Sequence, residues 1–216
     1  MSRNAHDFSR PRTPATVTSA SDPIRVDWIP TCHVKAWSGR LGMTFCPGKQ
    51  ADGLRLNVTY ARDLTADLSR IRIEERCDLL VTLLEPHEFK LLGVPNLQQT
   101  AESLGMKSVV VPWKDATIPS ADRSAPGFAA ALESALLTLR TGGNVVVHCR
   151  GGLGRTGTLV ACLLIASGLS GQAATEVTRR ARFGTIQTMD QELFVRAFAE
   201  RFRPPASTVR RRPAAR

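Results

Sequence analysis

The sequence predicts an α/β fold in which a central, mostly parallel sheet is flanked by helices on both faces. Two observations carry this prediction. Apolar runs of strand length alternate along the chain with longer segments whose apolar residues recur at helical spacing, and such alternation is typical of βαβ units. In addition, the run at residues 78–84 (DLLVTLL) is apolar at nearly every position, as a strand buried on both faces is.

Strands are expected where apolar residues cluster between turn-forming residues. The expected strands are residues 24–29, 41–45, 78–84, 107–111 and 144–147. Prolines follow two of them, at Pro47 and Pro112, and proline rarely continues a strand.

Helices are expected in the intervening segments. They are residues 65–76, 95–104, a helix capped by Ser124 that runs to residue 140, a helix from about residue 155, residues 171–183 and a helix from Thr188. The last begins with Thr188-Met189-Asp190-Gln191, which has the Thr-x-x-Gln form of a capping box. The helix after Arg155 is apolar on nearly every face, so we expect it to be buried.

The net charge of +10 lies largely at one end of the chain. Residues 201–216 hold six arginines and no acidic residue, so the body of the protein is only mildly basic. We therefore expect no nucleic-acid-binding surface on the folded core. Residues 1–22 are expected to be a disordered leader, and residues 204–216 a disordered basic tail that contacts an acidic partner or stays solvated.

The five cysteines show no CxxC or Cys/His pattern with zinc spacing, so no metal site is expected. Their odd number and scattered positions favour reduced thiols over a disulfide framework. The N-terminus lacks the apolar core of a secretory signal, and no apolar stretch is long enough to span a bilayer. We expect a soluble, cytoplasmic protein that needs no cofactor.

The run His148-Cys149-Arg150-Gly151-Gly152-Leu153-Gly154-Arg155-Thr156-Gly157 carries the chemistry. Cys149 and Arg155 bracket five residues, three of which are glycine, between a predicted strand and a predicted helix. Glycines let backbone N–H groups turn inward, and the helix directs its positive end toward the same place. This loop is predicted to cradle a phosphate, with Arg155 donating bidentate hydrogen bonds to two of its oxygens.

The same positive field favours the thiolate form of Cys149, which makes it the candidate nucleophile. We expect Thr156 to offer a hydroxyl to the sulfur and His148 to organise the loop rather than to act as a general base. Cys149 would attack phosphorus to give a cysteinyl-phosphate, and water would hydrolyse that intermediate without a metal.

A carboxylate must protonate the leaving oxygen and later activate the water. Asp115 follows a predicted strand on a loop that is able to overhang the phosphate cradle. Asp122 lies further along the same loop and is the alternative. We favour Asp115.

Other interpretations remain open at this point. Glycine-rich turns are often purely structural, and a buried cysteine is usually a small apolar residue, as we interpret Cys77 and Cys162. A Walker-type nucleotide loop is excluded because its lysine is missing. A phosphate-binding module without catalysis and a rhodanese-type sulfur transferase are the competing functions.

The loop resembles the signature of the protein tyrosine and dual-specificity phosphatase superfamily. The longer string CRGGLGRTGTLVACLL is similar to the branch that contains the kinase-associated and mitotic-exit phosphatases. Further motifs of the kinase-associated phosphatases occur in the same order: Val26-Asp27-Trp28-Ile29-Pro30, Leu41-Gly42 with Pro47-Gly48, Val94-Pro95-Asn96-Leu97, and Gly184-Thr185-Ile186-Gln187-Thr188 with Gln191. The resemblance spans roughly residues 24–202, which implies a phosphatase domain at residues 23–203.

The resemblance implies that Cys149 is the nucleophile, Arg155 the phosphate clamp and Asp115 the general acid. Residues 150–154 (Arg150, Gly151, Gly152, Leu153 and Gly154) would bind phosphate, and Gln187 or Gln191 would lie near the hydrolytic water. The implied substrates are phosphoproteins that carry phosphotyrosine or phosphoserine/threonine. Phosphoinositides or other small phosphate esters are the alternative, although Leu153 replaces a lysine of the phosphoinositide enzymes. Ala116 also departs from the family, whose acid loop often has glycines after the aspartate.

Overall fold

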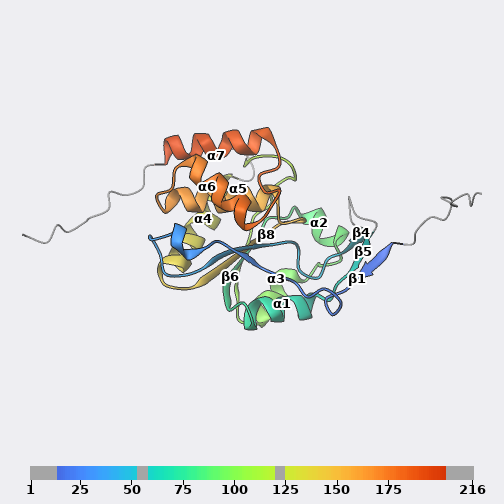
Figure 1. Cartoon of the computed structure of the whole chain (residues 1–216). Coiled ribbons are helices and arrows are strands. Elements are labelled where there is room, and N and C mark those ends of the chain that lie inside the picture. The colour runs from blue at the N-terminus through green and yellow to red at the C-terminus, as the bar shows by residue number, and fades with distance from the viewer. Residues whose placement is uncertain (1–13, 53–57, 120–124, 203–216) are drawn as a thin grey trace, which may run out of the picture.

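The computed structural model describes residues 14–52, 58–119 and 125–202 (Figure 1). Its strands are β1 (Ala15–Val17), β2 (Asp27–Trp28), β3 (Leu41–Thr44), β4 (Gln50–Asp52), β5 (Val58–Ala61), β6 (Cys77–Thr82), β7 (Lys107–Val110) and β8 (Asn144–His148). Its helices are the short 3₁₀ helix η1 (Thr31–His33), α1 (Leu64–Ile73), α2 (Pro86–Leu91), α3 (Leu97–Ser103), α4 (Ala125–Arg140), α5 (Gly154–Ala166), α6 (Gly171–Ala181) and α7 (Met189–Arg201).

The central sheet has the strand order β2-β3-β8-β6-β7. Strands β3, β8, β6 and β7 are parallel, and β2 is an antiparallel edge strand. Thr44 of β3 and Thr82 of β6 both lie opposite His148 of β8. Three parallel strands therefore end at one level, with the segment after β8 between the other two, and the predicted mostly parallel sheet is confirmed.

Helices cover both faces of this sheet, as predicted. Figure 1 shows α4, α5, α6 and α7 on one face and α1 and α3 on the other. The side chains of β8 alternate accordingly, since Val145 and Val147 belong to the core on one face and Val146 to the core on the other. Every residue of α5 is buried, which explains why its sequence is apolar on nearly every side.

Several predicted boundaries are wrong, for local reasons. Of the strand expected at residues 24–29, only Asp27 and Trp28 form β2, although the Ile29 amide also donates to the Leu41 carbonyl at 2.8 Å. Before them, the Arg25 carbonyl accepts the Thr44 hydroxyl at 2.8 Å. The helix expected at residues 65–76 ends at Ile73, since Arg76 takes a left-handed φ of 55°. The helix expected at residues 95–104 begins only after Asn96. Ser124, the predicted cap of α4, lies outside the described residues.

A second, three-stranded sheet was not predicted. Its order is β1-β5-β4, with Ala15 of β1 opposite Val58 of β5. Residues 15–22 are therefore not the disordered leader that the sequence suggested: they form β1 and a turn in which the Ser19 hydroxyl accepts a hydrogen bond from the Asp63 amide at 2.9 Å. The short, half-exposed strands of this sheet carry no apolar run by which the sequence would reveal them. Residues 1–13 and 203–216 lie outside the described part.

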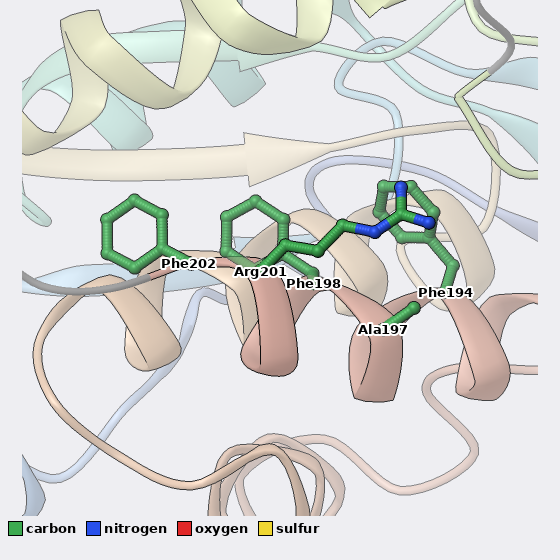
Figure 2. Close-up of a pocket in the computed structure, with 5 residues that line it drawn as sticks. All are labelled: Phe194, Ala197, Phe198, Arg201 and Phe202. Carbon is green, nitrogen blue, oxygen red and sulfur yellow. The ribbon is translucent and has the colours of Figure 1, made fainter.

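Helix α7 packs on α4 through aromatic side chains. Phe128 of α4 makes edge-to-face contacts with Phe194 and Phe198, with ring centroids 5.6 and 6.2 Å apart, and Phe198 stacks on Phe202 at 5.2 Å. Figure 2 shows these α7 rings beside Arg201, where they line a cavity of about 220 Å³ with Ala197. Such ring pairs add to simple area burial and hold α7, whose first turn borders the candidate site, against the domain.

Within the described residues, we find no helix with both the length and the apolar character needed to cross a lipid bilayer.

Candidate active site

The glycine-rich loop joins β8 to α5 at the carboxyl end of the sheet, where ligands bind in folds of this kind. Its conformation depends on Gly152, which takes a left-handed φ of 68°. A Cβ atom there would lie 2.1 Å from the Thr44 carbonyl oxygen, whereas a Cβ on Gly151 would meet nothing within 4 Å. Arg182, which follows α6, also holds the loop: its Nη2 donates to the Gly151 carbonyl at 3.1 Å, and its Nη1 pairs with Asp27.

The segment at residues 185–191 packs against the same loop. A Cβ on Gly154 would lie 3.0 Å from Gln187 Oε1 and from Gln191 Nε2, and a Cβ on Gly157 would lie 2.7 Å from Thr185 Cβ. These glycines therefore serve close packing rather than backbone freedom. The structure brings both predicted glutamines to the start of α5.

Cys149 directly follows β8 and is only 2 % exposed. Its sulfur lies within electrostatic range of Arg155, Lys49 and Cys46. In the described residues, no disulfide links it to another cysteine. A substrate must therefore enter the loop to reach the sulfur.

Arg155 is fully buried and is held by three groups from other elements. Nη1 donates to Glu88 Oε2 at 2.5 Å and to the Trp113 carbonyl at 2.8 Å. Nη2 donates to Glu88 Oε1 at 2.9 Å and lies 3.2 Å from Asp115 Oδ1. Burial lowers the pKa of Arg155, but the Glu88 hydrogen bonds and the charges of Cys149, Glu88 and Asp115 outweigh it and raise that pKa overall. The guanidinium stays charged.

The Arg155 contacts also decide which of its donors are free. A guanidinium has five N–H groups. The Nη1 and Nη2 groups that face Glu88 and Trp113 are used, whereas Nε is buried with no partner among the described residues. A bidentate phosphate clamp must therefore use Nε together with the Nη2 hydrogen that now faces Asp115. The predicted phosphate clamp is compatible with this geometry if phosphate binds at the edge formed by Nε and Nη2 of Arg155.

Glu88 is a residue of this site that the sequence analysis missed. It lies at the third position of α2, just after β6, where its Oε2 also accepts the Glu85 amide at 2.9 Å. Burial raises the pKa of Glu88, but hydrogen bonds and charge from Arg155 lower it overall. The available signal was Glu85-Pro86-His87-Glu88 at a strand end, which has the form of a helix start with proline in the first turn.

The loop after β7 brings Asp115 to the site. Its side chain is 55 % exposed while one oxygen lies 3.2 Å from Arg155, so the carboxylate faces both solvent and the clamp. Trp113 anchors the loop: it is fully buried, and its Nε1 donates to the Thr117 carbonyl at 3.2 Å. Ala116 takes a left-handed φ of 58°, the conformation in which glycine is favoured, and this costs roughly 1 kcal/mol. Asp122, the alternative acid, lies outside the described residues.

Gln191 connects the acid loop to α7. It is fully buried, its Nε2 donates to the Thr117 carbonyl at 3.2 Å, and its Oε1 accepts the Gln187 amide at 2.9 Å. The predicted capping box is confirmed, since the Thr188 hydroxyl accepts the Gln191 amide at 3.2 Å. Trp113 and Gln191 thus donate to the same carbonyl, which fixes the loop from both sides.

His148 and Thr156 are both fully buried behind the loop. The His148 Nε2 lies 2.8 Å from Thr82 Oγ1 on the neighbouring strand, and burial lowers the pKa of His148 to about 4. A neutral, buried imidazole suits the predicted organising role. The Thr156 hydroxyl has no hydrogen-bond partner among the described residues, so it does not bind the Cys149 sulfur in this arrangement.

This fold, with an anion loop between the central strand and a buried helix, defines a protein tyrosine phosphatase-like α/β protein. Residues 70–195 match the family PTP-SAK, described as a Swiss Army Knife protein, DSP-PTPase phosphatase domain. The match covers more than half of the chain, so the protein belongs to this family of the dual-specificity phosphatase superfamily.

Individual relatives agree with this assignment. Cyclin-dependent kinase inhibitor 3 of Sus scrofa is 29 % identical over 185 residues, which cover 83 % of this chain and 80 % of the relative. The crystal structure of kinase associated phosphatase with its catalytic-site cysteine replaced by serine has a TM-score of 0.71 at 23 % identity and covers 82 % of this chain and 95 % of its own. Tk-PTP in the active form has a TM-score of 0.60 at 26 % identity, with coverages of 77 and 98 %.

The two neighbouring loop glycines should respond differently to substitution. We expect Gly152→Ala to lower the free energy of unfolding by about 2–4 kcal/mol, since it combines a left-handed φ with a clash against backbone. Gly151→Ala should change it by less than about 0.5 kcal/mol. Urea denaturation of both variants checks this, and equal losses would contradict the assigned loop conformation.

Removal of the Glu88 charge should destabilise the domain, because it leaves the buried Arg155 with the half-exposed Asp115 carboxylate as its one ion-pair partner in the described residues. We expect Glu88→Gln to lower the free energy of unfolding by about 3 kcal/mol. Glu102→Gln is the matched control, since the Glu102 side chain is exposed on α3 and accepts a hydrogen bond from Gln98 of the same helix. A Glu88→Gln variant as stable as the control would show that the pair is not needed to hold Arg155.

The lowered pKa of His148 predicts that acid destabilises the fold. Its pKa is about 4 when folded against an ordinary 6.5, so the unfolded chain binds more protons between these values and stability falls as pH drops through this window. The full shift corresponds to a loss on the order of 3 kcal/mol. Urea denaturation between pH 7.5 and 4 should show a shallower pH dependence for His148→Asn than for the wild type. Parallel curves would refute the assignment.

Proposed function

We propose that this protein is a metal-independent phosphomonoester hydrolase that acts on phosphoproteins through a cysteinyl-phosphate intermediate. The observation that carries the proposal is the convergence of Cys149, the open edge of Arg155 and the Asp115 carboxylate at the end of β8. A nucleophile, an oxyanion clamp and a proton donor are the three groups that the reaction requires.

In the first step, the Cys149 sulfur attacks phosphorus and the ester P–O bond breaks. Asp115 gives its proton to the departing oxygen, so the product alcohol or phenol leaves neutral. Arg155 and the inward-facing amides of the loop bind the three remaining phosphoryl oxygens and balance their charge.

In the second step, water attacks phosphorus and the P–S bond breaks. The Asp115 carboxylate accepts the proton of that water, which restores the acid, and the thiolate and inorganic phosphate are released. Gln187 and Gln191, which pack against Gly154, are the groups proposed to position the water.

The phosphoprotein assignment is supported by similarity to a protein named kinase associated phosphatase. The proposed substrates include proteins that carry phosphotyrosine and proteins that carry phosphoserine or phosphothreonine. Phosphoinositides and other small phosphate esters are the alternative, and a panel of all three classes, offered at equal concentration, separates them. A phosphoinositide turned over faster than every phosphopeptide would refute the phosphoprotein assignment. We also propose that the protein acts in the cytoplasm, where its five free cysteines stay reduced.

Cys149→Ser should abolish hydrolysis of an aryl phosphate, because a neutral hydroxyl is a far weaker nucleophile than a thiolate. The variant should still bind phosphopeptide. Cys162→Ser is the matched control, as Cys162 lies buried within α5, and it should retain turnover. Retention of most activity by Cys149→Ser, or tight binding of phosphopeptide by a wild type that shows no turnover, would refute the proposal.

Asp115→Asn should lower kcat by about 100-fold or more, the usual effect of a lost general acid. The loss should be largest for leaving groups of high pKa, such as the serine alkoxide, and smallest for activated aryl phosphates. An unchanged kcat would assign the role to another carboxylate, with Asp122→Asn the next variant to measure.

A further inference from the structure

One buried cation beside the active site lacks an anion. Three cations are buried in the described part of the chain: Lys49, Arg62 and Arg155. Arg62 makes two hydrogen bonds to Asp67, at 2.8 and 2.9 Å, and Arg155 makes two to Glu88. Asp67 and Glu88 are the two acidic residues that are equally buried there, so neither is left for Lys49.

Lys49 is 8 % exposed, and its Nζ lies over the ring of Tyr60, 4.4 Å from the centroid. No carboxylate of the described residues lies within ion-pair distance of that amine. An aromatic face compensates a charge only in part, and a buried charge without a partner is costly. Such a charge is retained most often where a site uses it.

The chain path places Lys49 next to the phosphate loop. Strand β3 ends at Thr44 opposite His148, and the Cys46 amide then donates to the Arg150 carbonyl at 3.4 Å. Lys49 follows three residues later. Burial lowers the pKa of Lys49 and so does the positive charge of Arg150, while Cys46 and Cys149 act in the opposite direction. Lys49 therefore lies within electrostatic range of both the loop arginine and the nucleophile.

Arg150, in the glycine-rich loop, also lacks an anionic partner in the described residues. It makes no ion pair with a carboxylate among the described residues, and its Nε is buried without a partner. Lys49 and Arg150 are thus two like charges within electrostatic range of each other, and neither forms an ion pair with a carboxylate of the described residues. This arrangement differs from that of Arg155, whose charge is already matched by Glu88.

We propose that Lys49 and Arg150 form a second oxyanion subsite, which binds a further acidic group on the substrate that is being hydrolysed. This inference rests on the proposed function and gives it a substrate class: phosphopeptides in which a second phosphorylated residue, or an acidic residue, adjoins the phosphoresidue. A second phosphate presents two negative charges and several acceptor oxygens, so it satisfies both cations better than a single carboxylate does.

The test compares kcat/KM for three matched peptides that carry one phosphate with neutral neighbours, one phosphate beside glutamate, and two adjacent phosphates. We expect the wild type to prefer the third over the first by at least tenfold, with the second between them. Lys49→Met keeps the apolar stem beside Tyr60 and should lower this ratio at least fivefold. The matched control is Lys107→Met, because Lys107 is exposed at the opposite end of the sheet, at the start of β7.

Three results would overturn the subsite. They are equal kcat/KM for all three peptides in the wild type, an equal loss on all three peptides in Lys49→Met, and faster turnover of a bisphosphorylated inositol headgroup than of any peptide. The second result would mean that Lys49 only supports the thiolate. If Lys49→Met does not fold, wild-type kinetics at rising ionic strength replace it: the tenfold preference should shrink as salt screens the added contact, and a salt-independent preference would contradict the proposal.

Failure of the proposed function is a separate outcome. If the wild type hydrolyses none of the peptides, the phosphatase assignment fails. The subsite is then judged by calorimetric binding of the same peptides to Cys149→Ser, in which tighter binding of the doubly phosphorylated peptide supports it and equal binding overturns it.

Discussion

The buried pair between Arg155 and Glu88 is the interaction on which the rest of the site depends. The two hydrogen bonds that Arg155 donates to the Glu88 carboxylate fix the plane of the guanidinium and leave its Nε without a partner in the described residues. The same pair ties α2, which follows β6, to α5, which follows β8. An unmatched charge in this interior would be costly. The orientation of the Arg155 guanidinium and the relative placement of α2 and α5 are therefore coupled.

The loop after β7, which carries Asp115, is held by a few hydrogen bonds at Trp113 and Thr117. Two segments that are distant in sequence meet at the Thr117 carbonyl, which accepts hydrogen bonds from Gln191 of α7 and from Trp113 of the same loop. Trp113 also offers its own carbonyl to Arg155. Movement of this loop is therefore linked to the clamp on one side and to α7 on the other. Ala116 takes a left-handed φ directly after Asp115, so the strained residue of the loop adjoins the candidate general acid.

Sequence alone predicted the parts of this site that are contiguous. The loop from His148 to Thr156 holds the predicted nucleophile, clamp and phosphate-binding residues within nine positions. Buried parallel strands are recognisable by their continuous apolar runs. The roles of Glu88 and Lys49 depend on a partner or on the lack of one, and partners are set by tertiary packing. The helix-start pattern at Glu85-Pro86 indicates where α2 begins, but not that Glu88 pairs with Arg155. The β1-β5-β4 sheet was not predicted because its strands are only three or four residues long and partly exposed. The alternation of apolar and polar residues at positions 54–60, which leads into β5, was the available signal.

The complete burial of α5 has a consequence for how this protein family diversifies. Because α5 is buried on every side, the glycine-rich loop at its start cannot shift unless the surrounding core repacks. The position of this loop is therefore the most constrained part of the candidate site. Variation in what the enzyme accepts must then arise at the surrounding rim, in the segments after β3, after β7 and before α7. Ancestral changes of preference should be sought there, and attempts to re-engineer selectivity have their best prospects at those three positions.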